Sequence, residues 1–178
     1  MKPIEQLHLL GQSIWYDNIE RKLLVNGEFA GMINRGEIRG VTSNPSIFNN
    51  AIANSGDYDD ALVTLAQRGL SKQEIYEHLA VQDIKAACDL FLPLYDKSNG
   101  VDGYVSLEVS PYLANDSVGT YDEAMRLWTW VDHPNLMIKI PATMAGLSAI
   151  EQSIAFGINV NVTLIFSIER YKEVMNSY

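Results

Sequence analysis

One lysine lies in the middle of an otherwise apolar, strand-like segment, Leu136–Ala142. This residue, Lys139, has an isoleucine on each side. Burying an ammonium group costs free energy unless the group is paired or gives up its proton. A neutral amine is a nucleophile, and an obvious reaction for it is Schiff-base formation with a carbonyl substrate. On local grounds alone, the charge could instead protect an edge strand from unwanted pairing.

Further polar residues occupy strand-like segments in the same alternating pattern. Each segment carries apolar side chains on one face, and its polar side chains fall toward the C-terminal end. Active sites of barrels built from parallel strands assemble at those ends. The candidate ring consists of Asp17, Thr42, Asn44, Glu108, Lys139, Asn161 and Thr163.

Structural interpretations compete with this one. Asp17 could be the N-cap of a helix over residues 18–25, and Asn44 stands before a proline, where it favours a turn. Glu108 could form an internal ion pair with Lys139, which would keep both side chains charged until a substrate enters. Two further candidates could merely fill a layer of a barrel interior: Asn161 and Thr163. Four arginines outside the ring are expected to be solvated: Arg35, Arg39, Arg126 and Arg170.

Alternating strand and helix patterns must position these residues. The strand-like segments are residues 13–17, 38–44, 103–109, 136–142 and 158–165. Helix starts are indicated between them, because Ser71–Glu74 and Thr120–Glu123 both match the capping box. Another helix begins near Ala145 and ends at Gly157, and residues 57–69 form a further plausible helix. Strands that alternate with such helices predict parallel pairing with right-handed crossovers.

The alternation of apolar and polar side chains along the strands distinguishes an open sheet from a barrel. Val160 and Val162 point to one face while Asn161 and Thr163 point to the other. Strands covered by helices on both faces should be apolar on both, whereas a (β/α)8 barrel gathers functional side chains inside. The sequence predicts an α/β fold of the (β/α)8 TIM-barrel class with five βα units, as one domain over residues 1–178. No glycine-rich dinucleotide or P-loop motif follows any of the strands.

Composition narrows the possible partners. The net charge of −9 and the pI near 4.7 disfavour nucleic acids and anionic membranes, which require clustered Lys and Arg. Cys88 is the single cysteine, so no internal disulfide or cysteine-based zinc site is possible, and a reducing compartment is indicated. The scattered His8, His78 and His133 suggest no metal site. No run approaches the roughly 20 apolar residues of a membrane span, and Met1–Glu5 has no leader-like apolar core, so we expect a cytoplasmic protein.

Several motifs in order resemble those of transaldolases. Gly40–Phe48 contains the Thr-Ser-Asn-Pro-Ser signature, and Leu136–Thr143 resembles the strand of the Schiff-base lysine. Two more segments match transaldolase motifs in order and position: Ser106–Val109 and Asn161–Ser167. Ser13–Asp17 resembles the first strand of the longer bacterial subtype of that family. The resemblance covers essentially the whole chain.

The resemblance implies a role for each candidate. Lys139 would attack the ketone of a ketose phosphate, and Asp17 would take the C4 hydroxyl proton as the C3–C4 bond breaks. Glu108 and Thr163 would position a water, with Glu108 relaying protons while the imine forms. The remaining candidates would hold the dihydroxyacetone unit: Asn44, Asn161 and Thr42. The protonated imine is itself an electron sink, so neither a metal nor another cofactor is expected.

The implied substrates are sugar phosphates: fructose 6-phosphate, sedoheptulose 7-phosphate, erythrose 4-phosphate and glyceraldehyde 3-phosphate. Five strands are fewer than the eight of a closed barrel, which typically takes about 250 residues. We therefore expect the chain to be a fragment of a transaldolase, without the residues that grip the phosphate, and with exposed strand edges that favour self-association. The alternatives are a non-catalytic fragment and a Schiff-base aldolase that releases dihydroxyacetone.

Overall fold

The computed structural model describes residues 3–178. Residues 1 and 2, part of the N-terminal segment predicted to contain no leader, lie outside the described residues. The chain divides into two compact units, Met1–Val105 and Ser106–Tyr178, and each is described by itself. The single domain predicted over residues 1–178 stays a prediction.

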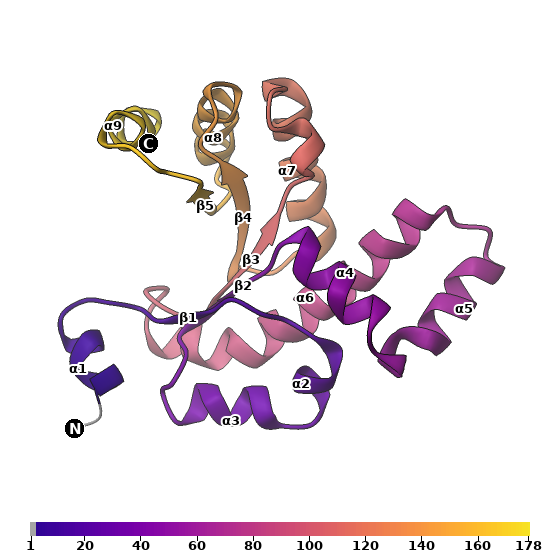
Figure 1. Cartoon of the computed structure of the whole chain (residues 1–178). Helices are drawn as coiled ribbons and strands as arrows, with labels where there is room; N and C mark the ends of the chain where they lie inside the picture. The colour runs from indigo at the N-terminus through magenta and orange to yellow at the C-terminus, as the bar shows by residue number, and fades with distance from the viewer. Residues whose placement is uncertain (1–2) are drawn as a thin grey trace. The chain divides into compact units, whose positions relative to one another are not determined.

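The first unit packs short helices around one long helix. α2 and α3 lie against α6, which α5 also contacts (Figure 1). Ser71 caps α6 through the predicted capping box, since its side chain accepts from the Glu74 N–H while the Glu74 carboxylate accepts from the Ser71 N–H. The elements are α1 (Pro3–Leu9), β1 (Trp15–Tyr16), α2 (Arg21–Val25), α3 (Glu28–Asn34), β2 (Gly40–Thr42), α4 (Pro45–Ala53), the 3-10 turn η1 (Gly56–Tyr58), α5 (Asp59–Gln67) and α6 (Lys72–Lys97).

The core of the first unit is aromatic around Phe29. Its ring meets Phe91 of α6 edge to face, with ring centres 5.6 Å apart, and it also meets Tyr16 of β1. β1 and β2 pair in parallel, with Trp15 opposite Gly40. A Cβ atom at Gly40 would overlap the Trp15 indole, so glycine is needed for the close approach of these two strands.

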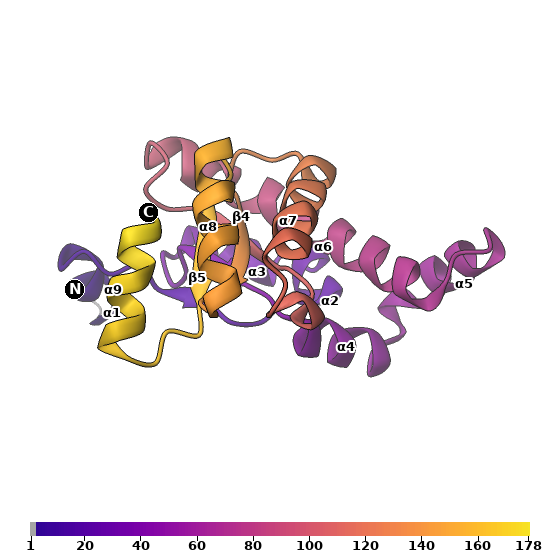
Figure 2. The same ribbon diagram turned by 90° about the horizontal axis from the view of Figure 1, so that it is seen from above.

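The second unit places helices along a short sheet. α7 packs against β4 and against α8, and α8 in turn contacts α9 (Figures 1 and 2). α8 ends at Gly157, which has a φ of 96° and is the expected left-handed C-terminal glycine. The elements are β3 (Tyr104–Glu108, which begins in the first unit), the 3-10 turn η2 (Pro111–Leu113), α7 (Ser117–Val131), β4 (Leu136–Pro141), α8 (Met144–Phe156), β5 (Val160–Thr163) and α9 (Ile168–Ser177).

The described strands form one sheet in the order β1-β2-β3-β4-β5, and β5 does not return to β1. β1 pairs with β2 in parallel, and β4 pairs with β5 in parallel. This confirms the α/β class with five strands of a barrel that is not closed. Since β4 lies between β3 and β5, the interpretation of Lys139 as the guard of an edge strand is wrong.

Three local predictions are also wrong. α2 begins at Arg21 after Glu20, so Asp17 is not its N-cap. α7 begins three residues before Thr120, and its N-cap is Asp116, which accepts from the Gly119 N–H. The fifth strand stops at Thr163 rather than continuing to residue 165, because Leu164 has a φ of 62°, a left-handed conformation that no extended strand contains.

Candidate active site

β4 presents Lys139 on the face opposite its buried isoleucines. Ile138 and Ile140 are fully buried, while the Lys139 side chain is 13% exposed. This alternation is the period of a strand, in which successive side chains leave on opposite faces. The lysine is thus largely withdrawn from water and still reachable from it.

Glu108 supplies the charge partner of the lysine. The Lys139 Nζ lies 3.1 Å from Glu108 Oε2, and the Glu108 side chain is 15% exposed. The main chains of the two strands are joined as well, because the Val109 N–H donates to the Lys139 carbonyl at 3.1 Å. The internal ion pair considered from the sequence, which is compatible with catalysis, is therefore present. It also places a proton acceptor on the amine that would have to lose a proton before attacking a carbonyl.

β5 brings a carboxamide and a hydroxyl to the same face. Asn161 stands opposite Lys139 in the parallel register, and Thr163 follows two residues later, opposite Pro141. The Asn161 Nδ2 donates to the Ser106 Oγ at 2.9 Å, which leaves the amide oxygen free to accept from a ligand hydroxyl. The structure thus brings four predicted residues together: Glu108, Lys139, Asn161 and Thr163.

Ser106 lies on the same strand face as the candidate residues, although the sequence alone did not indicate it. It is fully buried, and it lies two residues before Glu108 on the same face of β3. The period-two pattern that indicated Glu108 would also have indicated Ser106. Its hydroxyl fixes the orientation of the Asn161 carboxamide.

The turn after the lysine strand is held by Thr143, the N-cap of α8. Its hydroxyl accepts from the Gly146 N–H at 2.9 Å and donates to the Ala114 carbonyl at 2.5 Å. Gly146 is needed for this tight path, because a Cβ there would lie within 3.0 Å of the Pro141 carbonyl oxygen, a separation that real Cβ atoms essentially never show. The end of β4 and the start of α8 are therefore locked together.

Three predicted residues belong to the first unit. Asp17 directly follows β1 and is exposed, and Thr42 is the last residue of β2. The Asn44 Oδ1 caps α4 by accepting from the Ile47 N–H at 3.0 Å, so its structural role is that of an N-cap rather than the expected turn residue, and its Nδ2 donors remain for a ligand. The Thr42 Oγ1 is buried without a hydrogen-bond partner among the described residues, a costly state unless a ligand or water satisfies it.

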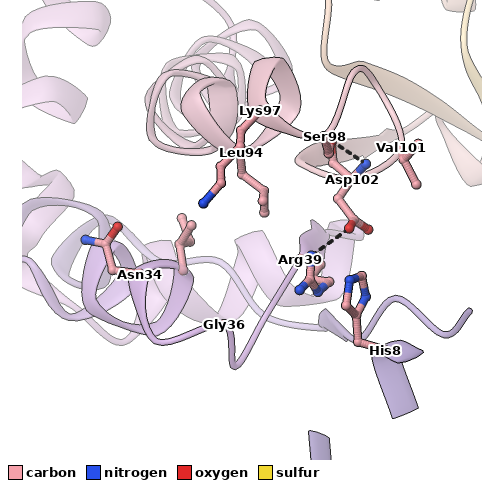
Figure 3. Close-up of a pocket in the computed structure, with 10 residues that line it drawn as sticks. His8, Asn34, Gly36, Arg39, Leu94, Lys97, Ser98, Val101 and Asp102 are labelled. Carbon is pink, nitrogen blue, oxygen red and sulfur yellow. Dashed lines mark hydrogen bonds and ion pairs between the residues drawn. The ribbon is translucent and has the colours of Figure 1, made fainter. Parts of the chain in front are cut away.

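A separate pocket of about 520 Å³ lies in the first unit, where residues just before the N-terminal ends of β2 and β3 line it. Figure 3 shows Arg39 pointing to Asp102, with His8 beside it and Lys97 projecting from the end of α6. The Arg39 Nη1 is 2.8 Å from Asp102 Oδ2, and Ser13 also donates to the buried Asp102 carboxylate. Arg39, Asp102 and Ser13 thus satisfy one another at this end of the strands, as expected where residues stabilise a barrel fold rather than perform its chemistry.

Within residues 3–178, no group of three or more His, Cys, Asp or Glu side chains is arranged to hold a metal ion. Among the helices described there, none is both long enough and apolar enough to cross a membrane.

Comparison with known proteins gives the family. Residues 14–177 match the family described as transaldolase/fructose-6-phosphate aldolase. The chain is 53% identical over 169 residues to a transaldolase of Thiobacillus denitrificans, a match that covers 95% of this chain and 47% of the relative. It is 49% identical over 176 residues to a transaldolase of Thermobifida fusca, covering 99% of this chain and 48% of the relative.

The chain spans about half the length of the curated relatives it matches. The matched residues nevertheless include every candidate position from Asp17 to Thr163. The chain belongs to the transaldolase/fructose-6-phosphate aldolase family.

Proposed function

We propose that the protein containing this chain transfers a dihydroxyacetone unit from a ketose phosphate to an aldose phosphate through a Schiff base on Lys139. The observation that carries the proposal is the Lys139–Glu108 pair. Its 3.1 Å separation on a largely enclosed polar strand face provides a nucleophile and its proton acceptor in one place. The relatives named transaldolase favour this reaction over the alternatives.

The site residues would act in sequence. Glu108 takes a proton from the Lys139 ammonium, and the neutral amine adds to the ketone carbon to form a carbinolamine. Loss of water, with Glu108 returning the proton and Thr163 helping to hold the water, gives the protonated imine. A carboxylate that can give and take a proton within hydrogen-bond reach is the requirement for each of these steps.

Cleavage would follow at the C3–C4 bond. Asp17 takes the proton of the C4 hydroxyl, C4 becomes an aldehyde, and the bonding electron pair passes into the iminium to leave an enamine on Lys139. Thr42, Asn44 and Asn161 are proposed to hold the hydroxyls of the three carbons that remain. The enamine then attacks the aldehyde of an acceptor, and hydrolysis of the new imine releases the product.

We further propose fructose 6-phosphate and sedoheptulose 7-phosphate as donors, and erythrose 4-phosphate and glyceraldehyde 3-phosphate as acceptors. A cytoplasmic setting suits the single buried thiol of Cys88. Self-association through the end strands β1 and β5 stays a proposal for the 178-residue chain by itself.

A transfer assay on the native gene product tests this function. Fructose 6-phosphate with erythrose 4-phosphate should yield glyceraldehyde 3-phosphate and sedoheptulose 7-phosphate in equal amounts, and Lys139→Met should abolish both. Without an acceptor, little free dihydroxyacetone should appear. Steady release of dihydroxyacetone would establish the aldolase instead, and the absence of either reaction in the native gene product would leave the non-catalytic alternative.

A further inference from the structure

A buried polar cluster in the first unit ties the start of α2 to α6. The Arg21 Nε donates to Asp83 Oδ1 at 2.9 Å, and the hydroxyl of Tyr58 donates to Asp83 Oδ2 at 2.7 Å. The oxygen of that hydroxyl accepts the backbone N–H of Arg21 at 3.1 Å. The three residues form a closed ring of hydrogen bonds, in which Tyr58 is fully buried, Asp83 is 2% exposed and the Arg21 side chain is 18% exposed.

Arg21 is held through its main chain as well as its side chain. Its Nη2 also donates to Gln82 Oε1 at 3.2 Å, and its guanidinium carbon lies 4.4 Å from the centre of the Tyr58 ring. The first residue of α2 is thereby fixed in both position and orientation. Burial raises the pKa of the Asp83 carboxyl even though Tyr58 and Arg21 favour its charged form, so desolvation outweighs these two partners at this carboxyl.

Asp17 lies close to this anchor along the chain. It lies four residues before Arg21, and its exposed side chain makes no hydrogen bond or ion pair within residues 3–178. Its place is therefore set by the main chain on either side. On the N-terminal side, Tyr16 pairs with Val41 in the sheet, and on the C-terminal side the chain is fixed by the buried Ile19 and by Arg21.

We propose that Arg21, Tyr58 and Asp83 are positioning residues that hold the Asp17 carboxylate where it can take the proton of the C4 hydroxyl. The proposal rests on the proposed function, in which Asp17 acts only after the imine has formed. Loosening the cluster should therefore slow the breaking of the C3–C4 bond and leave imine formation on Lys139 intact. A displacement of about 1 Å is enough to slow an oriented reaction by about 100-fold.

The same unit offers a matched control. Asp102 is also 2% exposed, and it is paired with an arginine, Arg39, at 2.8 Å and with a hydroxyl, that of Ser13. This second cluster lies before β2 and β3 begin, in the pocket of Figure 3, whereas Asp17 follows the end of β1. Asp83→Asn and Asp102→Asn thus make the same chemical change in two buried carboxylates, each paired with an arginine and a side-chain hydroxyl.

The experiment traps intermediates with borohydride on the native gene product. Fructose 6-phosphate is added, and mass spectrometry measures two adducts on Lys139. A six-carbon phosphorylated adduct reports an imine that has not been cleaved, and a three-carbon adduct reports cleavage. The variants are Tyr58→Phe, which removes only a hydroxyl, Asp83→Asn and Asp102→Asn, with Asp17→Asn as the reference for lost cleavage. Total adduct measures the folded fraction that forms the imine.

We expect Tyr58→Phe and Asp83→Asn to keep total adduct within about twofold of the parent and to raise the ratio of six-carbon to three-carbon adduct by about 10-fold or more. Asp102→Asn should leave the ratio unchanged. An unchanged ratio in both cluster variants would overturn the inference, whatever their stability. An equal shift in Asp102→Asn would overturn it too, because the effect would then be general loosening. Failure of the parent to form either adduct would remove the proposed function and this inference with it.

Discussion

Gly146 provides a stability test of the turn that carries the lysine strand into α8. In Gly146→Ala, the new methyl group would lie within 3.0 Å of the Pro141 carbonyl oxygen and 3.0 Å from the Thr143 hydroxyl. The first of these atoms is backbone, so the end of β4 or the first turn of α8 must move. The second is the N-cap of the helix, so the cap is disturbed as well.

The expected change in the free energy of unfolding of Gly146→Ala has three contributions. Forcing a methyl group into a closed site costs about 1–3 kcal/mol, and weakening the cap costs about 1 kcal/mol more. Alanine in place of glycine in a helix returns about 0.5–1 kcal/mol. The free energy of unfolding should therefore fall by about 1–3 kcal/mol, which for a urea slope of about 2 kcal/mol per M lowers the denaturation midpoint by about 0.5–1.5 M.

Gly31→Ala is the matched control, because it makes the same substitution inside α3. The new methyl group there meets the Arg35 guanidinium, with Nη1 2.9 Å and Cζ 3.8 Å away, at the far end of a flexible and exposed side chain. Gly31→Ala should therefore stabilise the chain by up to about 1 kcal/mol. Equilibrium urea denaturation followed by circular dichroism measures both variants. A Gly146→Ala chain at least as stable as the parent would refute the reasoning about the turn.

Three shorter predictions follow from buried or paired groups. Burial raises the pKa of the Asp83 carboxyl, so the folded state holds this proton more tightly than the unfolded state does. The carboxyl therefore contributes its whole stabilisation below about pH 4, and this stabilisation is lost as pH rises through the folded-state pKa. The stability of the parent relative to Asp83→Asn should therefore decrease with rising pH in denaturation curves. Burial also raises the pKa of the Cys88 thiol to about 12, so iodoacetamide at pH 8 should label it only in denaturant. Glu108→Gln should slow imine formation on Lys139 by about 100-fold or more, as measured by the rate of adduct trapping.

Each of these has an outcome that contradicts it. A stability difference between parent and Asp83→Asn that is constant or grows with pH would show that the carboxyl titrates without a burial penalty. Rapid labelling of Cys88 in the folded chain would show that α6 opens readily. Trapping at the parental rate in Glu108→Gln would remove Glu108 from the proton transfers. Glu123→Gln provides the comparison, because the Glu123 side chain on α7 is 16% exposed, close to the 15% of Glu108.

Local periodicity predicted much of the site because it depends only on neighbours in the chain. The alternation around Lys139 and Glu108 placed both side chains on the polar face, and the same rule applied to β3 would have added Ser106. The capping box at Ser71 was likewise readable, since its bonds span three residues. The similar pattern at Thr120 failed because the helix already begins at Ser117, and the Thr120 hydroxyl donates instead to the Leu113 carbonyl at 2.8 Å.

Long-range pairing could not be predicted in this way. Arg39, expected to be solvated, is only 24% exposed and pairs with Asp102, a partner 63 residues away in the sequence. Arg21 and Asp83 are 62 residues apart, and neither stands in a motif that would suggest the other. The end of the fifth strand could not be predicted either, because Leu164 has a positive φ, a conformation that leucine rarely adopts.

The central claim is that Lys139 is the residue that becomes bonded to the substrate. Incubation of the native gene product with fructose 6-phosphate, reduction with borohydride and peptide mapping by mass spectrometry test it directly. We expect a stable adduct on the peptide that contains Lys139, retained in Asp102→Asn and absent in Lys139→Met. An adduct on another lysine, or none in the native protein, would contradict it.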